Sequence, residues 1–263
     1  GASGDGPSLA RLLADVRAAA ARQDWSAALL ALREVPDQPP GPEWAPLFYA
    51  VLACCCKAGR YFEALTVWDA MPERHERSYN MLINLCGRVR RLDEARALFA
   101  EMPSRGLQAS SVTYCALLSA FATQARYKEA SELLQEMKQQ PHLDATADWD
   151  QVYLLVMTAA GRAGQYQATR RLLEECRQLR VFKFRHHHFN ALLVACARNM
   201  DGAAAESIFD EMRAEGLAPR EIDWNVLIQC LRGDFAACAL AYRRMREEAG
   251  LAPTEETFAA LIP

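Results

Sequence analysis

The chain repeats itself, and the length of the repeat limits the folds open to it. Aromatic residues recur at intervals of 31 to 39 residues, and two further series follow the same interval. Three series with one period predict a repeat architecture in which each unit packs only against its neighbours. The aromatic series is Phe48, Tyr79, Tyr114, Tyr153, Phe189, Trp224 and Phe258. The second series is Met71, Met102, Met137, Cys176, Met212 and Met245, and the third, of small residues, is Ala28, Ala64, Ala95, Ala130, Thr169, Ala205 and Cys238.

Each unit has the pattern of two helices. In the stretch YNMLINLCGRVRRLDEARALFAEM, which begins at Tyr79, apolar residues fall at i, i+3, i+4 and i+7 on both sides of a short basic turn. Endings such as GLAPR (216–220) place a glycine and then a proline where a helix must stop. No segment alternates with a sustained period of two. The sequence therefore predicts an all-α fold, a right-handed α-solenoid of helix-turn-helix repeats.

The series also predict the domain organisation. Residues 1–44 are expected to form a degenerate N-terminal helical cap and a loop, and residues 255–263 to begin a seventh, incomplete repeat. Between them lie six repeats, 45–75, 76–110, 111–149, 150–185, 186–220 and 221–254. One helix pair cannot bury its apolar face alone, so the stacked units are expected to share a continuous core.

Composition excludes several classes of protein. The formal net charge is −3 over 263 residues, which argues against a strongly basic nucleic-acid-binding domain. The nine cysteines are odd in number and form no CxxC pair, so we expect free, buried thiols and no zinc site. The longest apolar run, Ala45 to Cys56, is too short to span a bilayer. No targeting peptide is visible.

The motifs resemble those of the pentatricopeptide repeat family over nearly the whole chain. The resemblance rests on SVTYCALL with YKEA and LLQEM, on CKAGR (56–60), and on the GLAP endings. Tetratricopeptide repeats are the alternative, because they share the period and the central alanine. They usually carry a small residue where this chain has methionine. The resemblance implies a non-catalytic protein of a mitochondrion or chloroplast that binds single-stranded RNA, one base per unit.

By that resemblance, two positions in each unit read a base: the residue after the aromatic, and the last residue. Unstacked bases expose edges that two polar side chains per repeat can satisfy. The units whose series aromatic is Phe48, Tyr114 or Tyr153 carry Tyr49, Cys115 and Leu154 at the first position, which departs from the usual asparagine. The base-reading candidates are Asn80 with Ser110, Asn190 with Arg220, and Asn225 with Thr254. For Asn80 with Ser110, the resemblance suggests a pyrimidine.

Basic residues suggest two further RNA contacts. A cation stands near the end of the first helix in four of the six units, at Lys57, Arg88, Arg162 and Arg198. We call these four residues the phosphate ladder. They could bind successive phosphates of an RNA strand, or they could be there only because a cation at the C-terminal end of a helix is stabilised by the helix dipole. A second group, the basic patch, is predicted to be a solvated surface able to dock RNA or an acidic protein. It consists of Arg170, Arg171, Arg177, Arg180, Lys183 and Arg185.

No motif indicates catalysis. The sequence has no phosphate-binding glycine loop and no recognisable nucleophile arrangement, so we expect no enzyme activity, no cofactor and no metal. The consecutive histidines 186–188 are not expected to converge on one ion. Two functions remain open: RNA binding in RNA processing, stability or translation, and a protein-binding scaffold subunit of an organellar ribosome or membrane-protein complex. No small-molecule substrate is expected.

Overall fold

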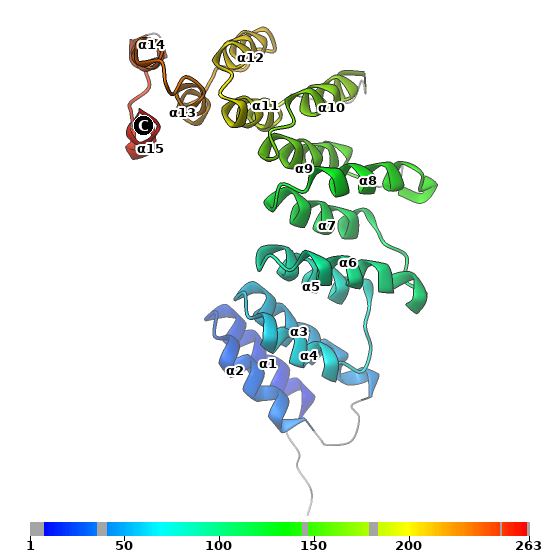
Figure 1. The fold of residues 1–263 in the computed structure, drawn as a ribbon. Coiled ribbons are helices and arrows are strands. Elements are labelled where there is room, and N and C mark those ends of the chain that lie inside the picture. Colours follow the sequence, from blue (N-terminus) through cyan, green and yellow to red (C-terminus); the bar gives the residue numbers. More distant parts are fainter. Residues whose placement is uncertain (1–7, 36–40, 144–146, 179–183, 248, 262–263) are drawn as a thin grey trace, which may run out of the picture. The chain divides into compact units, whose positions relative to one another are not determined.

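The computed structural model describes residues 8–35, 41–143, 147–178, 184–247 and 249–261. All regular structure in these residues is helical, which confirms the all-α prediction. Among them, no helix is both long and apolar enough to cross a membrane. The chain divides into two compact units, Gly1–Ala120 and Phe121–Pro263, and each is built from helical hairpins (Figure 1).

The helices pair in chain order. The first unit holds α1 (Leu9–Ala21) with α2 (Trp25–Leu30), α3 (Ala45–Lys57) with α4 (Tyr61–Ala70), and α5 (Glu76–Arg88) with α6 (Leu92–Glu101). The helix α7 (Ser111–Thr123) follows, and α8 (Tyr127–Lys138) begins the helices that lie wholly in the second unit. The later helices are α9 (Trp149–Arg162) with α10 (Tyr166–Gln178), α11 (His186–Asn199) with α12 (Gly202–Ala214), α13 (Glu221–Cys230) with α14 (Phe235–Glu247), and α15 (Glu255–Leu261).

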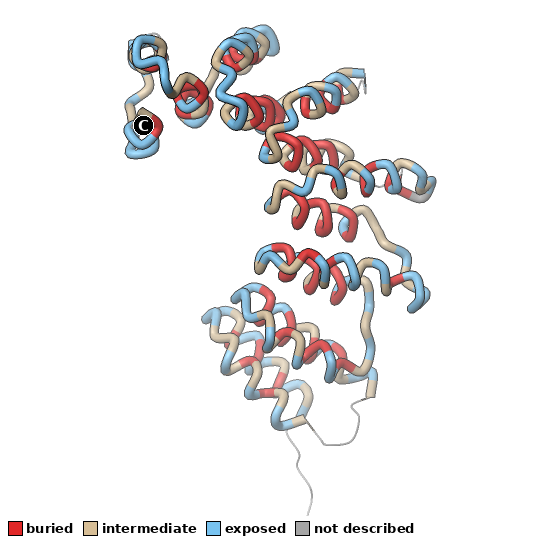
Figure 2. The backbone as a smooth tube through the Cα atoms, viewed as in Figure 1, coloured by how far each residue is buried: buried red, intermediate tan, exposed pale blue. Residues whose placement is uncertain are grey.

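The core of each unit follows the first helix of every pair. Figure 2 shows buried residues concentrated along α5, α9, α11 and α13, while α10 and α12 are more exposed. The series aromatic is the fourth residue of α5, α11 and α13, and Tyr79, Phe189 and Trp224 are all buried there. Equivalent aromatics therefore occupy equivalent places on successive hairpins.

Aromatic pairs join one hairpin to the next. The ring of Trp68 in α4 lies 4.8 Å from the ring of Tyr79 in α5, edge to face. The same contact recurs at 4.9 Å between Phe209 in α12 and Trp224 in α13. Such edge-to-face pairs add roughly 0.5–1.5 kcal/mol beyond area burial, so the aromatic series holds neighbouring repeats together.

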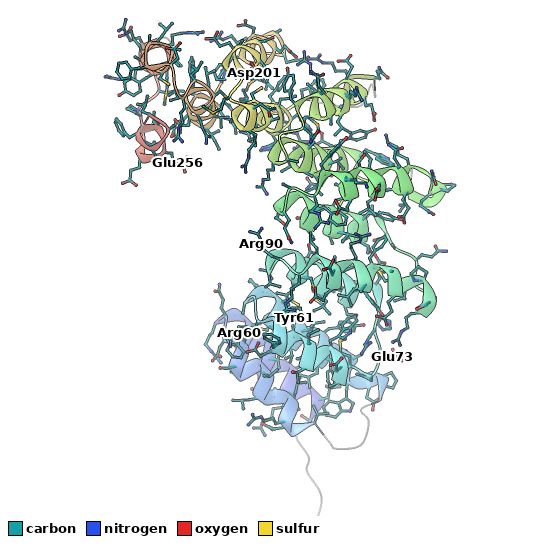
Figure 3. All side chains as sticks on the ribbon, viewed as in Figure 1. Arg60, Tyr61, Glu73, Arg90, Asp201 and Glu256 are labelled. Atoms are coloured by element: carbon teal, nitrogen blue, oxygen red, sulfur yellow. The ribbon has the colours of Figure 1, made fainter. Side chains whose placement is uncertain are left out.

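Each hairpin turn contains a residue in the left-handed conformation. Gly59 and Gly164 adopt it without strain, whereas Arg90 and Ala125 adopt it with φ of 64° and 56°. Arg90 lies at the turn between α5 and α6 (Figure 3). We propose to keep the six predicted repeats, each of which encloses one helix pair; α9 starts at Trp149, just before the predicted start of its repeat.

Candidate nucleic-acid interface

One carboxylate gathers the first pair of base-reading candidates. Glu76 is the first residue of α5, and its Oε1 accepts hydrogen bonds from Asn80 Nδ2 at 3.4 Å, from Thr113 Oγ1 at 3.1 Å, and from Ser110 Oγ. Asn80 and Glu76 are one helical turn apart, so their side chains share a face. Burial raises the pKa of Glu76, but the hydrogen bonds from Ser110, Thr113 and Asn80 outweigh burial and lower it below its ordinary value.

The same arrangement recurs in the sixth repeat. Glu221 begins α13, and its Oε1 accepts from Asn225 Nδ2 at 3.1 Å and from the hydroxyl of Thr254. Thr257 takes the place of Thr113 in sequence and accepts a hydrogen bond from the Thr254 main-chain N–H at 3.1 Å. Asn80 with Ser110, and Asn225 with Thr254, are therefore brought together as neighbours around one acid.

In the fourth repeat, the acid at the start of the first helix is Asp150, and it forms ion pairs. Asp150 lies 3.6 Å from the guanidinium of Arg185 and 3.3 Å from Nε2 of the buried His188. Burial lowers the pKa of His188 and outweighs the opposing effect of the Asp150 carboxylate. Leu154, at the reading position of this repeat, offers no hydrogen bond, so we assign this repeat no base-reading role.

The fifth repeat does not bring its candidate pair together by hydrogen bonding. Arg220 is held by Asp223, whose buried carboxylate accepts from the Arg220 main-chain N–H at 2.9 Å and from its Nε at 3.5 Å. Asn190 is half-buried and makes no hydrogen bond to Arg220 within the described residues. In the first repeat, the rings of Tyr49 and His75 stack with centroids 5.7 Å apart.

Two members of the phosphate ladder cap neighbouring helices. Arg88 donates to the main-chain oxygens of Lys57, at 3.4 Å, and of Cys56 at the end of α3. Arg162 donates to the Ala122 oxygen in α7 at 3.1 Å. The Cys56 and Ala122 oxygens also accept from the turn N–H groups of Gly59, at 3.2 Å, and Ala125, at 3.4 Å, so both arginines add a second donor at a helix end. Lys57 and Arg198 are exposed, and their side chains make no hydrogen bond or ion pair with the described residues.

Three of the four basic-patch residues that the structure describes form ion pairs. Arg170 lies 2.6 Å from Glu211 in α12, and Arg177 lies 3.3 Å from the same carboxylate. Arg185 pairs with Asp150, as described above, while Arg171 is exposed. Arg180 and Lys183 lie outside the described residues. The acid that pairs with Arg170 and Arg177 lies on the next hairpin, far from them in the sequence.

Glu76 and Glu221 are the functional candidates that sequence reasoning missed. Both stand four residues before the reading-position asparagine and on the same helical face, so the pattern Glu-x-x-x-Asn carries the signal. The contacts to Ser110 and Thr254 span more than 30 residues and require the hairpins to be stacked.

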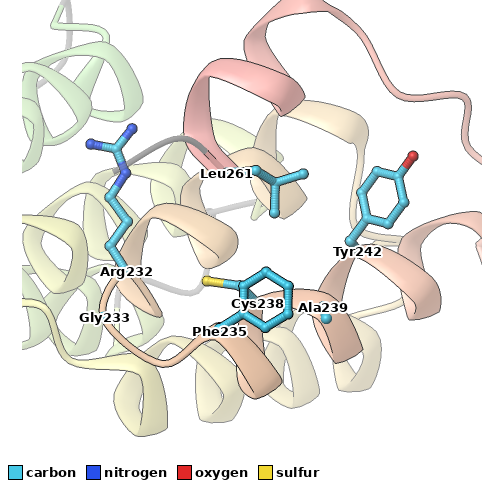
Figure 4. Close-up of a pocket in the computed structure, with 7 residues that line it drawn as sticks. All are labelled: Arg232, Gly233, Phe235, Cys238, Ala239, Tyr242 and Leu261. Carbon is cyan, nitrogen blue, oxygen red and sulfur yellow. The ribbon is translucent and has the colours of Figure 1, made fainter.

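A cavity near the last helices is not part of this interface. It has a volume of about 420 Å³ and lies between α14 and α15 (Figure 4). Phe235, Cys238, Tyr242 and Leu261 give it an apolar lining. Its one cation, Arg232, donates to the main-chain oxygen of Ala259 at 2.7 Å and is already engaged at the end of α15. The described residues contain no group of His, Cys, Asp and Glu side chains arranged to hold a metal ion.

Comparison with known proteins agrees with the repeat geometry. Models of pentatricopeptide repeats match residues 47–75, 74–123, 112–141 and 171–234. A mitochondrial pentatricopeptide repeat-containing protein of Arabidopsis thaliana is 25% identical over 211 residues, which are 79% of this chain and 43% of that protein. A chloroplastic one from the same plant is 26% identical over 180 residues, 66% of this chain and 18% of that protein.

A solved structure shows the same fold. It is the pentatricopeptide repeat protein PPR10 in complex with an 18-nt psaJ RNA element, with a TM-score of 0.69, 20% identity, and coverage of 95% of this chain and 40% of that one. The chain spans less than half the length of each of these three proteins. The two plant relatives are named as a mitochondrial and a chloroplastic protein, which supports the predicted organellar localisation. The helical-repeat solenoid fold is confirmed, and the chain belongs to the pentatricopeptide repeat family.

Proposed function

We propose that this protein binds single-stranded RNA in a mitochondrion or chloroplast and acts there, without catalysis, in RNA processing, stability or translation. The observation that supports it best is the convergence of Asn80 with Ser110, and of Asn225 with Thr254, at matching places on two hairpins. A structural relative was solved with RNA bound, and its fold is the one found here.

The chemistry of these pairs suits an unstacked base. Asparagine carries both an acceptor and a donor, and a hydroxyl can do either, so two such side chains can match the edge of one base. The exposed cations Lys57 and Arg198 are available for phosphates. With a net charge of −3, the protein has no strong general attraction for nucleic acid, so local contacts must supply the affinity.

A protein-binding scaffold in an organellar assembly is the second candidate. The pairing within the basic patch favours it, because paired arginines have fewer donors left for phosphates. Phe235 also favours it, since this large side chain is 88% exposed beside the cavity of Figure 4. Such exposed aromatic residues are common at protein contact sites.

Titration of a labelled random-sequence RNA with the full chain, at about 50 and 200 mM salt, tests the first candidate. If all four ladder residues meet phosphates, the log–log slope of affinity against salt is about −3. No binding at the lower salt would overturn RNA binding. Recovery of the chain in a stoichiometric protein complex after nuclease treatment would support the scaffold instead.

A further inference from the structure

Two apolar side chains on the last helices are exposed, although their equivalents in earlier repeats are covered. Phe258 continues the aromatic series and is 49% exposed, whereas the six earlier members of that series are at most 4% exposed. Phe235 begins α14 and is 88% exposed, whereas the first residue of each second helix from α4 to α12 is buried or half-buried. Those residues are Tyr61, Leu92, Tyr127, Tyr166 and Gly202.

In earlier repeats, the next hairpin covers this position. The guanidinium of Arg91, which directly precedes α6, lies 4.4 Å from the ring centroid of Tyr61. A Cβ built on Gly202 would come within 2.4 Å of Leu231, at the end of α13. No described second helix follows α15, so the corresponding place beside Phe235 is open, and it forms the apolar cavity of Figure 4.

The first helix pair does not have such an apolar face. The terminal repeats of a solenoid usually present a polar outer surface, which keeps the array soluble. The exposed residues of α1 include Arg11, Asp15 and Arg17, whereas α14 exposes Phe235 and Leu240. The cavity beside α14 is therefore suited to contact with another apolar surface.

Charges show what kind of surface this is. Lys138 in α8 and Arg177 in α10 each stand eight residues after the small residue of the third series. Each pairs with a glutamate of the next second helix, Lys138 with Glu175 at 2.9 Å and Arg177 with Glu211 at 3.3 Å. Both glutamates stand six residues after their own small residue. Neighbouring second helices thus join a cation of one to an acid of the next at fixed positions.

Arg246 is the cation at this position on α14. It is exposed, and its guanidinium lies 6.0 Å from the ring centroid of Tyr242, which lines the cavity. It makes no ion pair with any residue that the structure describes. A helix that fills the cavity as α10 and α12 fill theirs would bring an acid to Arg246.

We propose that the cavity between α14 and α15 binds one amphipathic helix of a partner protein, with its apolar face on Phe235 and Tyr242 and a carboxylate on Arg246. The apolar lining and the exposed cation beside it are complementary to such a helix, and an amphipathic helix laid into an apolar groove is a common mode of recognition. This binding goes beyond the proposed contact with RNA and does not depend on it. It also gives the scaffold alternative a defined site and a defined class of partner.

The probe for the test is a fluorescently labelled peptide with the sequence of α12, Gly202–Ala214. This second helix carries Glu211, the acid that pairs with a cation at the position of Arg246. A lactam between Glu206→Lys and Asp210, which are both exposed in α12, keeps the short peptide helical in isolation. Its binding to the full chain is measured by fluorescence anisotropy.

Phe235→Ser should weaken binding of this peptide about tenfold, because it removes apolar surface that the peptide would bury. Phe62→Ser is the matched control and should leave binding unchanged. Phe62 is also a large exposed aromatic residue near the start of a second helix, but it does not line the cavity. Since both side chains are exposed, neither substitution removes a core contact.

A charge exchange tests the ion pair separately. Arg246→Glu should weaken binding about tenfold, because it places a like charge opposite Glu211 of the peptide. A peptide with Glu211→Arg should bind the Arg246→Glu protein more tightly than it binds the wild type. A purely apolar association would not show this reversal.

Two results would overturn the proposal. One is a lack of peptide binding at about 1 mM, or equal binding to the wild-type and Phe235→Ser proteins. The other comes from sedimentation equilibrium without peptide: a wild-type dimer that Phe235→Ser dissociates would show that a second copy of this chain fills the cavity. None of these variants alters a base-reading or ladder residue, so RNA binding by the same preparations is tested independently.

Discussion

Gly161 in α9 lies directly against the main-chain carbonyl of Ala191 in α11. A Cβ built on Gly161 would overlap that carbonyl oxygen and come within 3.1 Å of its carbon. The obstacle is backbone, which cannot rotate away as a side-chain end can. The absence of a side chain at residue 161 therefore sets the close packing of two successive first helices.

Gly161→Ala should lower the free energy of unfolding by about 1–3 kcal/mol, because the added methyl group forces α9 and α11 apart. Denaturant unfolding measures this. Gly202→Ala is the matched control: its Cβ would meet chiefly the flexible end of Leu231, which can move aside. Equal stability of the Gly161→Ala and wild-type proteins would show that the helices do not pack as closely as described.

Ala125 lies in a hairpin turn where its left-handed backbone conformation would suit glycine better than alanine. Its φ is 56°, a conformation that costs a residue with a Cβ roughly 1–2 kcal/mol. Ala125→Gly should therefore stabilise the protein by about 1 kcal/mol, measured by denaturant unfolding. Ala163→Gly is its counterpart, because Ala163 has φ of −81° and should lose about 0.5 kcal/mol on the same change. Destabilisation by both substitutions would contradict the assigned turn geometry.

The hairpins could be predicted because packing fixes which residue types they use. The buried aromatics, the methionine series and the small residues recur at one interval, so Tyr79 and Trp224 identify their helices without any structure. The hairpin turns were harder to predict from the sequence. Glycine signals the turns at residues 59 and 164, but Arg90 and Ala125 adopt the same conformation without that signal.

Partners of charged residues could not be predicted, because they lie one repeat away. Arg177 pairs with Glu211 and Arg88 donates to the end of α3, each more than 30 residues distant. The sequence shows which residues are charged, but it does not show which residues of the neighbouring hairpin lie opposite them. For the same reason, Glu76 could be placed beside Asn80 on one helix, while its contact with Ser110 needed the stacked structure.

His188 should make stability depend on pH. It is buried between Asp150, 3.3 Å away, and the start of α11, where Arg185 and His187 add positive charge, and its pKa is lowered from 6.5 chiefly by burial. The unfolded chain then binds more protons below pH 6.5 than the folded chain does. The free energy of unfolding should therefore fall as pH drops below 6.5, until the pH passes the folded-state pKa.

Thermal melting at about pH 7.5 and 5.5 measures this dependence. His188→Gln removes the titrating group and should reduce the loss of stability between the two pH values. His187→Gln, at the exposed neighbour, removes only a lesser cause of the lowered pKa of His188 and should leave most of the loss in place. A wild-type protein that melts higher at the lower pH would exclude a buried neutral histidine.

Cys115 should react selectively with iodoacetamide. All nine cysteines lie within the described residues, none of them forms a disulfide there, and Cys115 is the one that is not buried. Burial raises the pKa of Cys56 and of Cys230 to about 12, so these thiols stay protonated. Mass spectrometry of the folded protein should find the label at residue 115, and Cys115→Ser should abolish it. Cys115 stands at the position that reads a base by resemblance to the family, so under the proposed function bound RNA should slow the labelling. Unchanged labelling at saturating RNA would place the RNA elsewhere.

Substitution of the exposed ladder residues should affect RNA binding, whereas substitution of a ladder residue that caps a helix should affect stability. Lys57→Gln with Arg198→Gln removes two exposed cations that hold no described partner, so it should reduce the salt dependence of RNA binding by a log–log slope of about 1.4 and leave unfolding unchanged. Arg88→Gln removes donors from the carbonyls at the end of α3, so it should lower the free energy of unfolding by about 1 kcal/mol. Salt titrations and denaturant unfolding of the same preparations measure both effects. A slope unchanged by the double substitution would remove Lys57 and Arg198 from the phosphate path, because each neutralised phosphate contributes its own share of released counterions.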